Sequence, residues 1–113
     1  MGITVEERIE ALLNSLPQSE KLAVISHGAV LYLSVLRKRL SFAEERIRQF
    51  EEKYNCSLDE LDAKGLPDDA DYLMHEDYIM WHHWVDTVEK LKEEIEILNE
   101  IATQGLCSGE FSC

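Results

Sequence analysis

The fold is decided by residues 19–54, which read SEKLAVISHGAVLYLSVLRKRLSFAEERIRQFEEKY. No proline interrupts this stretch, and its apolar residues recur at heptad spacing, which predicts one long helix of coiled-coil type. The part from Ala23 to Leu36 is apolar on almost every side. Because a helix of this kind has to be buried on every side, we expect it to need more than one neighbouring helix.

Three further helices are predicted outward from this segment. Residues 71–102 carry an apolar stripe in alternating steps of three and four, which indicates a second long helix. The capping box that begins at Ser57 opens a short helix over residues 58–64, and Gly65 closes it. A similar box at Thr4 opens an amphipathic helix over residues 4–16, which Pro17 ends.

These helices predict one all-α domain over residues 1–102, built on an antiparallel hairpin of two long coiled-coil-like helices with a short N-terminal helix. The aperiodic tail, residues 103–113, is expected to be disordered. Two long helices alone enclose little interior, so a homodimer that forms a helical bundle is expected. The residues assigned to the core or dimer interface are Leu22, Ala29, Leu33, Leu36, Leu40, Ile47, Phe50, Val88, Leu91, Ile95 and Leu98.

Charge and composition exclude several classes of function. The 113 residues include 23 Asp and Glu against 11 Lys and Arg, a net charge of −12, so direct nucleic-acid binding and attachment to an anionic membrane are not expected. No apolar run reaches the length of a membrane span, and the N-terminus lacks signal-peptide character. These features favour a cytoplasmic protein, in which we expect Cys56, Cys107 and Cys113 to be free thiols without a role.

No motif indicates an enzyme or a cofactor. The chain has no phosphate-binding glycine loop and no arrangement of a nucleophile beside a base. The spacing of two histidines and two acids on one helix leaves a weak alternative, a metal-binding helical bundle, because residues one turn apart can grip one ion. Its ligands would be His82, His83, Asp86 and Glu89.

Aromatic and acidic residues gather around the hairpin tip. The aromatic residues lie at stripe spacing, which indicates core packing first, although Tyr and Trp are also enriched at binding hot spots. The acidic residues favour association with a basic partner. The predicted partner-binding residues are Tyr72, Tyr78, Trp81, Trp84, Asp68, Asp69, Glu76 and Asp77.

Residues 44–84 resemble a known class of small proteins. EERIRQFEEKYN (residues 44–55), SLDEL (57–61) and DYIMW (77–81) are similar to the pattern of small acidic helical antitoxins from prokaryotic type II toxin–antitoxin pairs. The sequence departs from that pattern at Tyr54, Asn55 and Cys56, and its histidines are not part of it. The resemblance implies a partner-binding protein and no enzymatic activity, without assigning a role to any single residue.

The charge, the heptads, the aromatic residues and the resemblance together predict a non-enzymatic interaction module. Its expected partner is a basic protein, such as a ribonuclease toxin that it neutralises. Two alternatives stay open at this stage: the metal-binding bundle described above, and a structural coiled-coil subunit of a larger assembly.

Overall fold

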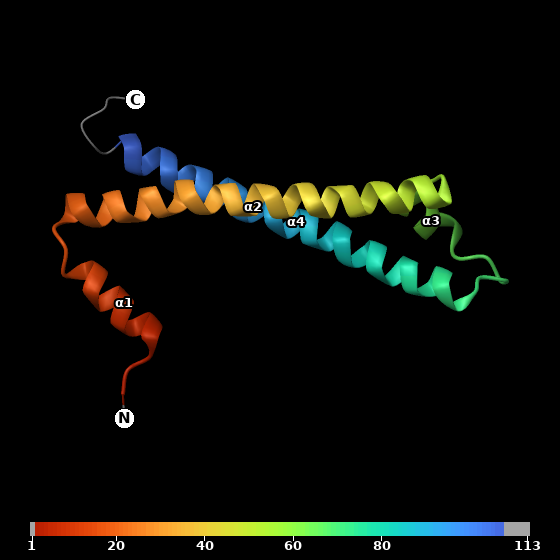
Figure 1. Ribbon diagram of the computed structural model, residues 1–113, viewed down its shortest axis with the longest axis horizontal. Helices are drawn as coiled ribbons and strands as arrows, with labels where there is room; N and C mark the ends of the chain where they lie inside the picture. The colour runs from red at the N-terminus through yellow and green to blue at the C-terminus, as the bar shows by residue number, and fades with distance from the viewer. Residues whose placement is uncertain (1, 108–113) are drawn as a thin grey trace. The chain divides into compact units, whose positions relative to one another are not determined.

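The computed structural model describes residues 2–107, which fold into helices joined by short connections (Figure 1). The helices are α1 (Val5–Asn14), α2 (Gln18–Tyr54), α3 (Leu58–Lys64) and α4 (Tyr72–Cys107), and none of the described residues forms a strand. The all-α class is confirmed, and so is the predicted order, in which a short helix precedes each long one.

The long helices α2 and α4 pack against each other as a hairpin. Phe42 of α2 contacts Trp84 of α4, whereas Phe50, farther along α2, contacts Trp81, which precedes Trp84 in the chain. Lys53, near the end of α2, pairs with Asp77, near the start of α4. Because the contacts move backward along α4 as they move forward along α2, the two helices are antiparallel.

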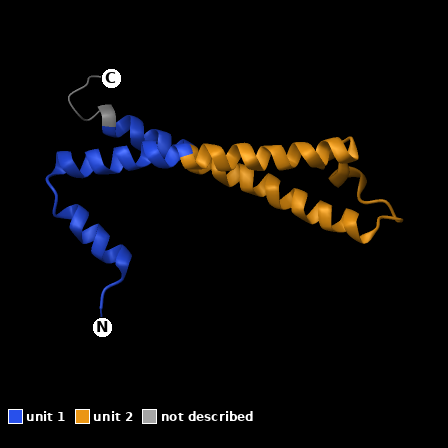
Figure 2. Cartoon of the chain, viewed as in Figure 1, with its two compact units in different colours: residues 1–34, 96–113 blue, residues 35–95 orange. Residues whose placement is uncertain are grey.

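The chain divides into two compact units (Figure 2). Unit 1 comprises Met1–Ser34 and Glu96–Cys113, and so contains α1, the first part of α2 and the last part of α4. Unit 2 comprises Val35–Ile95, and so contains the rest of both long helices together with α3.

Unit 2 is built around a buried tryptophan. Trp81 has 0% of its surface exposed, and its indole stacks against Phe50 and Tyr54 of α2, with ring centroids 5.7 and 5.9 Å away. Leu58 and Leu61 of α3 are buried in the same cluster. Because α3 supplies two of the three buried members of this cluster, this short helix is part of the core that fixes the start of α4.

Unit 1 is held by small side chains where α2 and α4 approach closely. Ser26, Ala29 and Ala102 are buried, and a Cβ atom built on Gly105 would lie 2.3 Å from Ser26 Cβ. Only glycine fits at such a separation. The prediction that the helix ends at residue 102 is wrong, because α4 continues to Cys107 with Gly105 as a packing residue. Residues 108–113 of the predicted tail lie outside the described residues.

Side-chain caps set several helix ends as the sequence predicts. The N–H of Glu7 donates to Thr4 Oγ1, and the N–H of Glu60 donates to Ser57 Oγ, each over 3.1 Å. Asp71 also acts as a cap, because its Oδ1 accepts the Met74 N–H over 2.9 Å. Gly65 ends α3 with a φ of 77°, a conformation that favours glycine.

The residues assigned to the core or dimer interface all lie on inner faces. Ala29, Leu33, Leu36 and Leu91 are buried. The other seven are half-buried: Leu22, Leu40, Ile47, Phe50, Val88, Ile95 and Leu98. In the single chain, therefore, four of these residues are buried and seven remain partly exposed.

The all-round apolar segment of α2 is not covered on every side. Val24, Val30 and Leu31 remain exposed. The ten-residue helix α1 contains no buried residue. Large apolar side chains of unit 1 therefore face solvent in the single chain.

Within residues 2–107, no helix combines the length and the apolar character needed to cross a membrane.

Candidate interaction site

The aromatic residues predicted to bind a partner occupy different environments. Trp81 is fully buried in the core of unit 2 and offers no surface to a partner in this structure. Tyr78 is half-buried, and Trp84 is half-buried with its ring edge-on to Phe42. Tyr72 has 74% of its surface exposed, so it is the member of this set that is most accessible to a partner.

Asp77 ties the end of α2 to the start of α4. Its Oδ2 accepts hydrogen bonds from Lys53 Nζ and from the Tyr54 hydroxyl, each over 2.5 Å. The Lys53 hydrogen bond, and then that of Tyr54, hold the pKa of the Asp77 carboxyl below its usual value. The pKa of Lys53 is raised in return, chiefly through its hydrogen bond to Asp77. Asp77 therefore has a structural role at this point of the hairpin.

Asp62 of α3 forms a second link to α4, which the sequence did not indicate. Its Oδ1 accepts a hydrogen bond from the Tyr78 hydroxyl and lies 2.9 Å from His82 Nε2. Because a carboxylate only accepts hydrogen bonds, Nε2 carries the proton in this contact. The Tyr78 hydrogen bond, followed by that of His82, lowers the pKa of the Asp62 carboxyl.

Other carboxylates around the tip are directed to solvent. Asp68, Asp69 and Glu76, all predicted partner contacts, are exposed. Asp59 and Glu60 of α3 are exposed as well. Unit 2 therefore carries solvent-exposed negative charges in addition to the carboxylates used inside the hairpin.

The start of α4 also exposes an apolar stripe that sequence reasoning missed. Tyr72, Leu73, Ile79 and Met80 are large side chains with 41–74% of their surface exposed. Their spacing places them with Glu76 on the side of α4 opposite Trp81. We call the set Tyr72, Leu73, Glu76, Ile79 and Met80 the tip face. The spacing of these residues, in steps of three, four and seven, could have indicated a second face of the helix. We predicted only one apolar face for this helix, the stripe that contains Trp81 and Trp84.

The side chains of the predicted metal alternative do not gather into a ligand cluster. His82 contacts Asp62, and the ring of His83 lies edge-on to Trp84, while Asp86 and Glu89 are exposed. No group of three or more His, Cys, Asp or Glu residues is placed to hold a metal ion anywhere in residues 2–107. Cys56 is a half-buried free thiol, and the side chain of Cys107 and all of Cys113 lie outside the described part.

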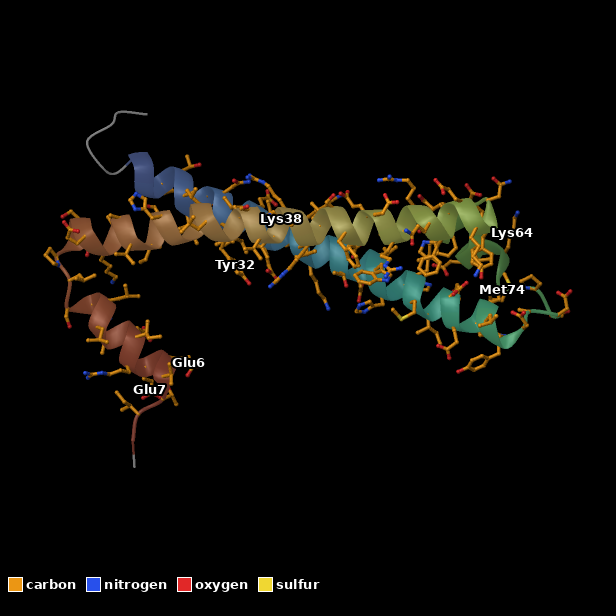
Figure 3. The ribbon with its side chains drawn as sticks, viewed as in Figure 1. Glu6, Glu7, Tyr32, Lys38, Lys64 and Met74 are labelled. Atoms are coloured by element: carbon orange, nitrogen blue, oxygen red, sulfur yellow. The ribbon has the colours of Figure 1, made fainter. Side chains whose placement is uncertain are left out.

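Figure 3 labels the side chain of Lys64 at the end of α3 and that of Met74 near the start of α4. The connection between these two helices is short and contains Asp68 and Asp69.

Comparison with known proteins does not identify a family for this chain. It matches no protein-family model, no curated protein sequence and no solved structure.

Proposed function

We propose that this chain is a non-enzymatic interaction protein whose tip face binds and neutralises a basic protein, such as a ribonuclease toxin. The observation that carries the proposal is the uncovered apolar stripe of the tip face, which lies among solvent-directed carboxylates. Exposed apolar side chains surrounded by polar residues are typical of surfaces that bind other proteins.

Charge supports the basic character of the partner. The chain carries a net charge of −12. Glu76 adds negative charge within the tip face, and Asp68 and Asp69 add it shortly before this face in the chain. Such a surface attracts a positively charged protein at long range and repels acidic ones. The resemblance of residues 44–84 to small acidic antitoxins favours the same kind of partner.

The proposal includes a cytoplasmic location, where such a toxin would act, and a homodimeric state. The dimer is supported by the apolar side chains of α1 that a single chain leaves exposed, Val5, Ile9 and Leu12. Burial of such side chains between two copies would remove them from water and stabilise both chains.

A photo-crosslinking amino acid at Ile79 tests the tip face in the organism that carries this protein. Ile97 is the matched control, since it is an isoleucine of the same helix with similar exposure, 58% against 62%, and lies in unit 1. We expect a basic protein to be captured from position 79 and not from position 97, with less capture at higher salt.

Growth then tests neutralisation. The captured protein, expressed alone, should arrest growth, and co-expression of this chain should relieve the arrest. Ile79→Lys should abolish the relief, because it places a positive charge in the apolar stripe facing a basic partner, whereas Ile97→Lys should not. Equal capture at both positions, or a captured protein without effect on growth, would contradict the proposal.

A further inference from the structure

A groove between α2 and α4 of unit 2 lies outside the tip face. Its volume is about 530 Å³, and its floor is mainly apolar, formed by Phe42, Trp84 and Leu91. Lys38, Arg39 and Thr87 complete the lining. Phe42 contacts the edge of Trp84, with ring centroids 5.5 Å apart, yet 53% of its surface is exposed. The aromatic floor of the groove is therefore incompletely covered.

Positive charge surrounds this groove in an otherwise acidic protein. Lys38 and Arg39 line it, and the guanidinium of Arg46 lies 5.2 Å from the centre of the Phe42 ring. A basic partner would be repelled here, so the protein proposed to bind the tip face does not suit the groove. An apolar segment that also carries acidic residues does suit it, because both its shape and its charge are complementary.

The helix α1 has that chemistry and is largely exposed. Val5, Ile9 and Leu12 recur at helical spacing and are exposed, and none of the ten residues of α1 is buried. Glu6 lies beside this apolar stripe, and Glu10 lies farther round the helix. Figure 3 labels the side chains of Glu6 and Glu7 on α1, and that of Lys38 on α2. A helix of ten residues is marginal in water without tertiary packing, so α1 needs a surface to dock on.

We propose that the groove of one chain binds α1 of a second copy, and that the two copies exchange these helices reciprocally. The apolar stripe of α1 then covers the Phe42, Trp84 and Leu91 floor, and Glu6, which flanks the stripe, lies near the basic residues Lys38 and Arg46. A single chain leaves both surfaces uncovered. A symmetric dimer forms two equivalent contacts between α1 and the groove, so that both surfaces of each chain are covered. This inference specifies the interface of the proposed homodimer and uses none of the tip-face residues.

Sedimentation of the full chain at micromolar concentration tests the interface. The wild-type chain should sediment at twice its 13.1 kDa. Ile9→Glu and Phe42→Glu should each raise the dimer Kd about tenfold or more, because each places a charge in a buried apolar contact. Glu7→Gln, on the opposite side of α1, and Leu31→Glu, on α2 outside the groove, are the matched controls and should leave the Kd unchanged.

Mixing two defective chains separates exchange from other modes of association. A chain with Ile9→Glu keeps an intact groove, and a chain with Phe42→Glu keeps an intact α1, so their mixture should form a heterodimer with one complete contact. Because Ile9 is exposed in the single chain, its replacement should leave the helical circular dichroism of the long helices α2 and α4 native-like, which checks folding.

Three results would overturn the inference: a monomeric wild-type chain, a dimer that Leu31→Glu disrupts while Ile9→Glu does not, or the absence of a heterodimer in the mixture. Capture of the basic protein at Ile79 is measured in the same variants. Because the two surfaces share no residue, a wild-type chain that is monomeric but still captures the basic protein rejects the exchange and leaves the proposed partner standing. A chain that still dimerises but captures no basic protein from position 79 rejects only the proposed partner.

Discussion

Gly28 and Gly105 are both helical, but they have different surroundings. A Cβ on Gly105 would lie 2.3 Å from Ser26 Cβ, whereas a Cβ on Gly28 would meet no atom within 4 Å. The first glycine permits α2 and α4 to approach in unit 1. The second lies at an exposed position of α2, where glycine only lowers helix propensity.

Alanine at these two positions should therefore change stability in opposite directions. We expect Gly105→Ala to lower the free energy of unfolding by about 1–3 kcal/mol, because the helices have to separate to admit the methyl group. Gly28→Ala should raise it by about 1 kcal/mol, the propensity difference between the two residues. Urea unfolding followed by helical circular dichroism measures both, and a stabilising Gly105→Ala would disprove the close packing.

At the scale of elements, two carboxylates fasten the tip of the hairpin. Asp62 joins α3 to α4 through Tyr78 and His82, and Asp77 joins α2 to α4 through Lys53 and Tyr54. The pKa of each carboxyl is lowered from 3.8. Each carboxylate thus stabilises the fold fully above the unfolded pKa of about 3.8, and the contribution is lost as the pH falls through the lower folded-state pKa.

This linkage predicts a pH-dependent effect of Asp77→Asn. At pH 7 the variant should have a lower Tm than the wild type, because the charge that faces Lys53 is gone. The difference in Tm should shrink as the pH falls below about 4, where the wild-type carboxyl also becomes protonated. Thermal unfolding of both proteins between pH 7 and pH 2 measures this difference in Tm. The other carboxylates are present in both proteins, so their effect on the Tm is removed when the two values are subtracted.

Asp62→Asn should behave in the same way, through the hydrogen bonds from Tyr78 and His82. Asp69→Asn serves as the control, since Asp69 is an exposed residue of the connection before α4. It should alter the Tm little at any pH. A difference between Asp77→Asn and wild type that stays constant down to pH 2 would show that the carboxylate charge does not stabilise the tip.

At the scale of the whole molecule, the net charge of −12 opposes compaction. The ion pairs Arg48–Glu45 and Lys53–Asp77, at 2.6 and 2.5 Å, involve exposed or half-buried side chains, and such pairs contribute little stability. Repulsion among the many remaining carboxylates is therefore expected to be the dominant effect of salt on stability.

Added salt should consequently stabilise the protein. Raising NaCl from about 10 mM to about 150 mM shortens the screening length from about 30 Å to about 8 Å, so the Tm at pH 7 should rise. The triple variant Asp68→Asn, Asp69→Asn and Glu76→Gln, with three fewer negative charges, should have a higher Tm at low salt and a smaller rise. A Tm that falls with salt in the wild type would mean that ion pairs outweigh the repulsion.

Much of the fold follows from short-range patterns. The heptads of residues 19–54, the apolar stripe of residues 71–102 and the caps at Thr4 and Ser57 predicted the four helices, because spacing and capping are properties of the chain itself. The candidate site was less accessible to this reasoning. Trp81 and Tyr72 have similar aromatic character, and only packing shows that the first is buried and the second is exposed.

The sequence by itself determined the helical class, the order of the helices, and the excess of negative charge. Local backbone preferences and composition suffice for these properties. Tertiary structure alone decided that Gly105 continues a helix, that Asp62 and Asp77 act within the hairpin, and that Ile79 and Met80 face solvent. Each of these depends on which residues distant in sequence come together in space, and helical periodicity leaves that undetermined.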